Sequence, residues 1–278
     1  MTWIGFPVGV AVALLIVPAG VRGLLDAGLV RENFRCVPLA FPLGAVLATA
    51  GLVALAPLAF LDDRGSLELL DPQLRRWLPY VIGVAFLGFL DDSLGQGEAA
   101  NTPRGWRGHG RALREGRLST GAIKAIGALA LAAYVVSGRG LESWRYLADV
   151  ALLILATNAF NLLDLRPGRA EKGLALLGAA LCLGAWTFAP LDLLGIFAGP
   201  VLVGAAFTLR ERAMLGDTGS NLVGAIGGVW LLTTLGGTGR LIALATLAGL
   251  TIFGELRSIS ATIDSVPPLR WLDSLGRE

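Results

Sequence analysis

The sequence predicts an all-α integral membrane protein, built as one bundle of about nine transmembrane helices. Of its 278 residues, 54% are hydrophobic and only 16% are charged, whereas a soluble domain carries about 25% charged residues. The mean hydropathy is +0.67, and apolar segments long enough to cross a bilayer recur along the chain. No stretch reads as a separate soluble domain.

We expect one membrane-spanning helix for each apolar segment, with Gly and Pro inside the segments as membrane helices tolerate. The expected ranges are about 4–21, 38–61, 76–91, 121–137, 148–164, 173–190, 193–209, 219–235 and 240–256. The first segment has no basic residue before Arg22, so we interpret it as a retained helix rather than a cleaved signal peptide.

The basic residues predict the orientation of the bundle. The loops after the first, third, fifth, seventh and ninth segments, with their flanks, hold 17 Lys and Arg residues, and the remaining loops hold 6. Cytoplasmic loops are enriched in Lys and Arg. We therefore expect the N-terminus outside and the C-terminus in the cytoplasm.

Residues 1–257 are expected to form the transmembrane domain, and residues 258–278 an amphipathic segment on its cytoplasmic face, interrupted by Pro267 and Pro268. A loosely ordered tail is the alternative. Cys36 and Cys182 lie in different contexts, which predicts neither a disulfide nor a metal site. The net charge of +2 is too small to indicate a nucleic-acid partner.

Acidic residues gather at the predicted cytoplasmic ends of three segments. One group lies in GFLDDSLG, one in NAFNLLD and one in LGDTGSN. The three-residue spacing in the second group places two amides and a carboxylate in one drifting stripe of a helix. The candidate site residues from the three groups are Asp91, Asp92, Asn158, Asn161, Asp164 and Asp217.

These carboxylates indicate a cation site. At a helix C-terminus the macrodipole disfavours negative charge, so Asp91, Asp92 and Asp164 require a compensating cation. Oxygen ligands from several carboxylates suit Mg²⁺, which keeps some of its waters and shares its shell with phosphate. Asp217 precedes a helix, so capping of that helix is its alternative role.

Basic residues surround the acids. Arg104 to Lys124 supplies six cations, and Arg166, Arg169 and Lys172 follow Asp164 directly. Carboxylates for a metal and cations for phosphates are what phosphoryl transfer requires. The positive-inside rule alone is the alternative for the arginines of 104–117. His109 is either a plain loop residue or a general acid or phosphate contact.

In this order, GFLDD, NAFNLLD and GDTGS resemble the polyprenyl-phosphate N-acetylhexosamine-1-phosphate transferases, over roughly residues 20–256. VPLAFPLG resembles the Pro-Gly loop of that superfamily. The resemblance implies transfer of a sugar-1-phosphate from a UDP-sugar to a polyprenyl phosphate, with Mg²⁺ and release of UMP. It also implies a multi-pass location in a bacterial plasma membrane, in the synthesis of a cell-envelope polymer. Members of this superfamily often form homodimers, although nothing in these residues requires one.

Carried over by position, the resemblance implies catalytic roles for Asp91, Asp92 and Asp217. Its metal ligands would be Asp92, Asp164 and Asp217. Substrate contacts would come from Asn158, Asn161, Lys124, Arg166, Arg169 and His109.

The sequence departs from the family at DLRPGRA, where the pattern commonly reads DGxDGLA. Leu165 and Pro167 replace a glycine and an aspartate. The chain also lacks the family's histidine loop after the ninth helix and a tenth helix. Three hypotheses remain: a transferase with an altered donor site, a non-catalytic relative that binds polyprenyl phosphate or an envelope-synthesis partner, and a transporter or channel. The last would place ionisable residues near the bilayer midplane.

Overall fold

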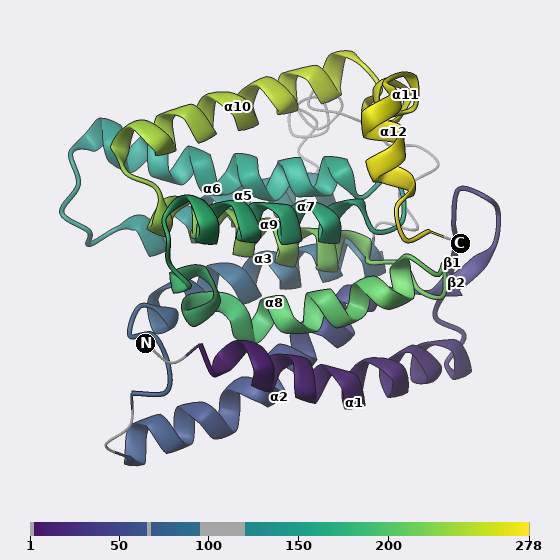
Figure 1. Cartoon of the computed structure of the whole chain (residues 1–278), viewed down its shortest axis with the longest axis horizontal. Helices are drawn as coiled ribbons and strands as arrows, with labels where there is room; N and C mark the ends of the chain where they lie inside the picture. Colours follow the sequence, from purple (N-terminus) through teal and green to yellow (C-terminus); the bar gives the residue numbers. More distant parts are fainter. Residues whose placement is uncertain (1–2, 66–67, 95–119, 278) are drawn as a thin grey trace.

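The computed structural model describes residues 3–65, 68–94 and 120–277, and within them the fold is helical apart from one short hairpin. Figure 1 shows the long helices running side by side along the longest axis. They are α1 (Gly5–Asp26), α2 (Leu43–Arg64), α3 (Leu74–Leu94), α5 (Thr120–Val136), α6 (Ser143–Leu163), α7 (Arg169–Gly184), α8 (Ala189–Thr208), α9 (Gly216–Thr234) and α10 (Gly237–Leu256).

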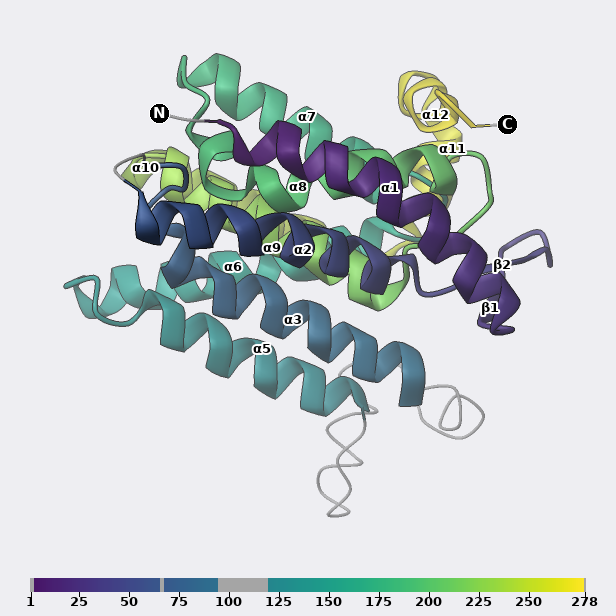
Figure 2. The same ribbon diagram turned by 90° about the horizontal axis from the view of Figure 1, so that it is seen from below.

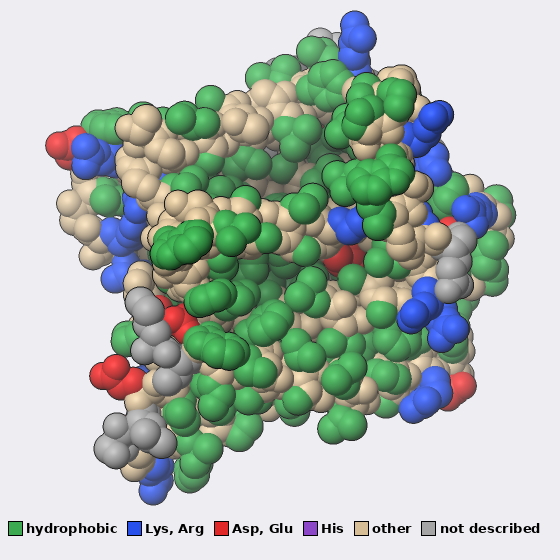
Figure 3. Space-filling model, viewed as in Figure 1, with side chains coloured by type: hydrophobic (Ala, Val, Ile, Leu, Met, Phe, Trp, Pro, Cys, Tyr) green, Lys and Arg blue, Asp and Glu red, His purple; other side chains and the backbone are tan. Residues whose placement is uncertain are grey.

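Each long helix overlaps one of the segments expected to span a membrane. Six of them, α1, α2, α3, α6, α8 and α10, are long and apolar enough to do so. Hydrophobic side chains cover most of the face shown in Figure 3, and charged side chains gather mainly toward its two ends. The chain therefore has the build of a multi-pass membrane protein, and nine crossings and their orientation stay predictions.

Helix α9 forms the centre of the bundle. Of its 19 residues, 16 are buried, and it packs against α2, α3, α6, α7 and α8. Glycines allow this packing because they let helix backbones approach closely. A Cβ on Gly224, for example, would lie 2.5 Å from the Thr157 Cα of α6.

The helices α3 and α5 lie together on one side of the bundle, as Figure 2 shows from below, and α10 lies on another side. Helix α10 packs mainly on α6 and has no buried residue. Its apolar side chains, such as Ile242 and Ile252, are exposed. Exposed apolar faces of this kind are expected where lipid is the solvent.

The segment between α1 and α2 is an antiparallel hairpin of β1 (Val30–Glu32) and β2 (Pro38–Ala40). The expected span 38–61 therefore begins too early, because residues 38–40 are a strand and α2 starts at Leu43. Two prolines explain the difference. Pro38 and Pro42 lack an N–H group, and each disfavours helical geometry in the residue before it.

After α10 the chain folds back as α11 (Ile259–Ser265) and α12 (Pro267–Ser274). The two helices lie at the same end of the bundle as the hairpin (Figure 1). The break between them falls at Val266, immediately before the two prolines that interrupt the expected amphipathic segment.

Candidate functional site

The first turn of α9 is held in place by the segment before α2. Met214 N–H donates to Ala40 O at 2.8 Å, Leu43 N–H donates to Met214 O at 2.8 Å, and Gly44 N–H donates to Leu215 O at 2.9 Å. Two N–H groups at the start of α2, which have no partner inside the helix, thus find carbonyls in the loop before α9. The VPLAFPLG and GDTGS motifs are therefore joined by backbone hydrogen bonds.

Two glycines bring α2 and α3 against this turn. A Cβ on Gly44 would lie 2.1 Å from Gly219 N, and a Cβ on Gly88 would lie 2.3 Å from Asp217 O. No larger residue fits at either position without moving backbone. The glycine of GFLDD thus allows α3 to bring both of its aspartates to the start of α9.

Asp92 caps α9. Its carboxylate accepts hydrogen bonds from Asp217 N–H at 3.0 Å, Thr218 N–H at 2.8 Å and the Thr218 hydroxyl at 2.6 Å. It is 3% exposed, and the Arg31 guanidinium lies 3.9 Å away. A carboxylate is favourable here because the N-terminus of a helix has unpaired N–H groups and positive potential.

Asp91 and Asp217 face each other beside Lys124, the fifth residue of α5. Lys124 forms a short ion pair with Asp217, and its Nζ lies 3.7 Å from Asp91 Oδ2. The two carboxyl groups are within hydrogen-bonding reach of each other, and the Thr120 side chain hydrogen-bonds to Asp91. All three charged side chains are partly exposed.

Asn161 of α6 completes this group. Its amide lies 2.9 Å from Ser220 Oγ. With the amide nitrogen facing Ser220, that nitrogen also donates to Asp217 Oδ1, and the amide oxygen accepts from Lys124 Nζ, each at 3.3 Å. We call Asp91, Lys124, Asn161 and Asp217 the acidic cluster, and the end of the bundle that holds it the acidic end.

Asn158 does not join the acidic cluster. Its amide donates to Thr251 Oγ1 of α10 at 3.2 Å. Successive three-residue steps on a helix lag by about 60°, since a turn takes 3.6 residues. Asn158, Asn161 and Asp164 therefore point in successively different directions. Asn161 faces the cluster, whereas Asn158 faces α10.

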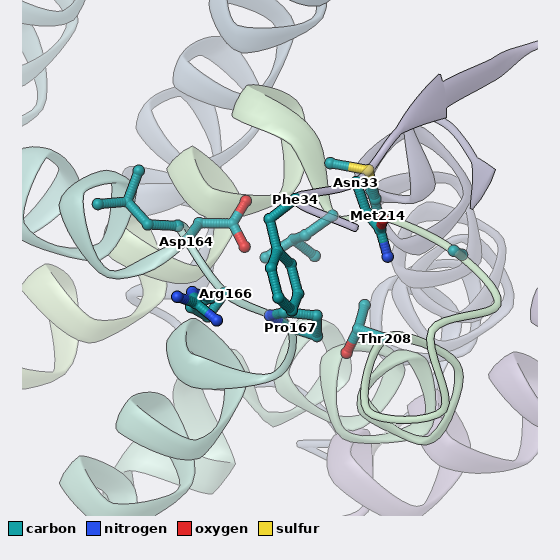
Figure 4. A pocket seen from close by; sticks show the side chains of 10 residues that line it. Asn33, Phe34, Asp164, Arg166, Pro167, Thr208 and Met214 are labelled. Atoms are coloured by element: carbon teal, nitrogen blue, oxygen red, sulfur yellow. The ribbon is translucent and has the colours of Figure 1, made fainter. Parts of the chain in front are cut away.

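Asp164 follows the last residue of α6 and lines a small pocket next to the cluster. Figure 4 shows its carboxylate on one side of the Phe34 ring, with Arg166 nearby. The pocket has a volume of about 50 Å³, and the Arg166 guanidinium lies 4.2 Å from the centre of the Phe34 ring. Its other walls come from Asn33, Leu165, Pro167, Thr208, Ala213, Met214 and Leu215.

The Asp164 carboxyl group in this pocket is close to other acidic groups. Burial, together with the nearby charges of Glu171, Asp217 and Asp92, raises the pKa of Asp164 well above its ordinary value. Glu171 is 1% exposed and accepts a hydrogen bond from the Thr208 hydroxyl at 2.6 Å. The neutral form of the Asp164 carboxyl is therefore favoured, unless a cation binds beside it.

Arg169 points into a different cluster. Its guanidinium is buried and donates twice to Asp273 of α12, at 2.6 and 2.8 Å, and once to Ser260 Oγ at 2.8 Å. Arg277 also donates to Asp273, and Lys172 Nζ donates to three carbonyls from Leu272 to Leu275. We call Arg169, Lys172, Asp273 and Arg277 the C-terminal ion-pair cluster.

This cluster explains the additional basic residues of DLRPGRA. Arg277 Nε donates to Pro167 O at 3.0 Å, so the segment between α6 and α7 is tied to the chain after α12. Although burial opposes it, the hydrogen bonds from Arg169 and Arg277 hold the pKa of Asp273 below its ordinary value. The sequence reasoning missed Asp273 and Arg277, and the excess of charge in DLRPGRA was the available sign that a paired acid was needed.

His109 and the arginines from Arg104 to Arg117 lie outside the described residues. The part played by that segment stays a prediction. Phe34, Arg31 and Thr120 were not among the expected site residues, because nothing in their local sequence indicates their contacts with distant parts of the chain.

The acidic cluster fits a hydrated Mg²⁺ better than a closed metal cage. Within residues 3–65, 68–94 and 120–277, no three His, Cys, Asp or Glu side chains are arranged to hold a metal ion. Asp91, Asp217 and the amide oxygen of Asn161 are hard oxygen donors around the Lys124 ammonium. Mg²⁺ commonly takes one or two carboxylates and completes its shell with water and phosphate oxygens.

The comparisons with known proteins add no family: no protein-family model matches this chain, and no curated protein matches it. The resemblance therefore depends on the short motifs, which the structure joins at one end of the bundle.

Proposed function

We propose that the acidic end transfers a sugar-1-phosphate, from a UDP-N-acetylhexosamine, to a polyprenyl phosphate in a bacterial plasma membrane. The observation that supports this most is the contact of Asp91 and Asp217 with Lys124 at the end of a membrane bundle. Two close carboxylates and an ammonium can position a metal-bound diphosphate and an anionic acceptor. The product would serve cell-envelope polymer synthesis.

In this proposal Asp91, Asp217 and the Asn161 oxygen would hold Mg²⁺, and the bound ion would supply neutralisation of charge on the diphosphate. Asp92 has a different task from the one expected for a metal ligand, because its oxygens already bind the N-terminus of α9. It fixes Asp217 at the position where the metal would bind. Lys124, which pairs with Asp217 in this structure, would hold a phosphate oxygen of the substrate.

The reaction is a substitution at the phosphorus bonded to the sugar. An oxygen of the lipid phosphate forms the new bond, and the bond to the phosphate of UMP breaks, so that UMP leaves with the electron pair. Asp91 accepts the proton of a monoprotonated lipid phosphate. Asp91 is assigned this role because it is hydrogen-bonded to the Thr120 side chain at the start of α5, the helix along which we expect the lipid to approach.

The lipid would reach the cluster along α3 and α5. Ile123 and Ile126 of α5 are 44% and 54% exposed on either side of Lys124 in sequence, and Phe86 and Phe89 of α3 are exposed before Asp91. Such side chains offer a polyprenyl chain an apolar surface that leads to the charged groups. The donor would approach from the Phe34–Asp164 pocket on the other side of the cluster.

The proposal is tested with purified protein in detergent and Mg²⁺, by following label from a panel of UDP-sugars to undecaprenyl phosphate. We expect a labelled lipid, released UMP, and loss of turnover with EDTA. Asp217→Asn should lower the rate about 10³-fold or more, because it removes a charge that binds the metal. Asp26→Asn, an exposed aspartate at the end of α1, should leave the rate unchanged.

A normal rate in Asp217→Asn, or turnover that resists EDTA, would contradict the metal assignment. The alternative function is a non-catalytic relative that binds polyprenyl phosphate. One observation favours it, namely that both arginines of DLRPGRA have partners within the protein. Arg169 is hydrogen-bonded to Asp273. Arg166 contacts Phe34 and lies 3.8 Å from Asp264, so neither arginine is free to bind substrate without losing a contact. Binding of polyprenyl phosphate without any labelled product would support this reading.

A further inference from the structure

The end of the bundle opposite the acidic end holds a second cavity with charged walls. It has a volume of about 510 Å³ and lies between the starts of α6 and α10. This size is within the range of small-molecule pockets. Its walls are Leu141, Trp144, Arg145, Ala148, Asp149, Leu152, Gly237, Thr238, Arg240 and Leu241.

Arginines outnumber acids around this cavity. Asp149 is 4% exposed, and its Oδ2 accepts from Arg139 at 2.7 Å and lies 3.4 Å from Arg240 Nη1. Arg145 adds a third guanidinium, whose acidic neighbour Glu142 lies 3.9 Å away. Because Asp149 fixes two guanidinium groups, their orientation is set without a ligand.

The surplus of positive charge is partly desolvated. Burial and the charges of Arg240 and Arg76 hold the pKa of Arg139 below its ordinary value, although Asp149 opposes them. Arg76 lies close because it donates to Ser137 O at 3.1 Å. An anion in the cavity would offset this crowding, and guanidinium groups bind phosphate oxygens in pairs.

The surroundings of the cavity are apolar and open. Trp144 and Leu241 in its walls are 52% and 45% exposed, and Leu147 and Ile242 next to them are 64% exposed. A Trp with its polar edge bonded, here to Glu142 at 2.7 Å, is typical of the membrane–water boundary. The apolar side chains would pack against acyl chains of a ligand whose head enters the cavity.

We propose that this cavity binds a phosphate group, and that the phosphate belongs to an anionic membrane lipid. Arg145 and Arg240 bind its oxygens, and Trp144 and Leu241 contact the first carbons of its chains. The site is distinct from the acidic cluster and does not depend on transferase activity.

The test is native mass spectrometry of the full chain in an uncharged detergent, with phosphatidylglycerol, phosphatidylcholine or inorganic phosphate added. We expect one phosphatidylglycerol to bind about tenfold more tightly than phosphatidylcholine. Arg145→Gln should remove most of this preference, because a charge-assisted hydrogen bond of this kind corresponds to about a tenfold change in affinity. Arg145 is largely exposed, so the variant should fold.

Arg75→Gln is the matched control, since Arg75 is exposed at the same end of the bundle and outside the cavity. It should bind phosphatidylglycerol as the unchanged protein does. Competition by inorganic phosphate at equal concentration would make free phosphate the ligand and overturn the lipid assignment. Equal binding of the two lipids, or unchanged binding in Arg145→Gln, would overturn the site.

Discussion

The two ends of the bundle combine carboxylates and cations in opposite proportions. At the acidic end, Lys124 forms ion pairs with two carboxylates, Asp91 and Asp217. At the opposite end, Arg139 and Arg240 form ion pairs with one carboxylate, Asp149. The first arrangement has an excess of negative charge, to which a metal ion can bind. The second has an excess of positive charge, to which an anion can bind.

Burial also separates the two ends. The Asp149 side chain is 6% exposed, whereas those of Asp91 and Asp217 are 25% and 32% exposed. A buried ion pair is costly to break because the remaining charge has no water to replace its partner. A partly exposed pair is screened and contributes less. The comparison thus separates a cluster that stabilises the fold from one that is available for chemistry.

The largest effect on stability is expected for Asp149→Asn. Two half-buried guanidinium groups would then face each other without a carboxylate, which should lower the free energy of unfolding by about 3 kcal/mol. Titration with sodium dodecyl sulfate in mixed micelles measures this change. Asp63→Asn is the control, since Asp63 is exposed and 3.8 Å from Arg75, and it should change stability by less than about 0.5 kcal/mol. Equal losses in the two variants would remove the contrast between buried and exposed pairs.

A smaller loss, about 2 kcal/mol, is expected for Asp92→Ala, because three hydrogen bonds to the start of α9 disappear. Asp91→Ala is the matched variant at the neighbouring position, and it should cost less stability while removing transfer. Faster hydrogen exchange at Thr218 N–H in Asp92→Ala would show directly that the first turn of α9 opens more often. If Asp91→Ala destabilised the protein more than Asp92→Ala, the division between a capping and a chemical aspartate would be wrong.

The smallest effect is expected for the stability of Asp217→Asn. The substitution weakens the ion pair with Lys124 but also removes repulsion from Asp91, so the free energy of unfolding should change by less than about 1 kcal/mol. The same detergent titration applies, with Asp26→Asn as the control. A loss as large as that of Asp149→Asn would mean that the acidic cluster is mainly structural.

The positions of the helices could be predicted from the sequence because apolar segments and their breaks are local properties. Helix α5 begins one residue from its expected start, at Thr120. Polar helix ends were harder to predict. Helix α6 begins at Ser143, five residues before the expected start, because its first turn includes Arg145 and therefore lies outside the apolar segment from which the span was predicted.

The candidate site could be predicted in part. Asp91, Asp217, Lys124 and Asn161 come together as residue types on helix ends that face the same way. The capping role of Asp92 could not be predicted, since it depends on the approach of Gly88 to the backbone of α9. The partner of Arg169 could not be predicted either, because Asp273 is 104 residues away in the chain.

The C-terminal ion-pair cluster has a consequence for biosynthesis. A ribosome releases residues in order, so the DLRPGRA segment enters the membrane boundary about a hundred residues before Asp273 exists. Until then the Arg169 guanidinium lacks its carboxylate, and the wall of the Phe34–Asp164 pocket lacks the hydrogen bond from Arg277 to Pro167. Completion of that pocket is therefore a late event, which follows synthesis of the residues of α1 to α10.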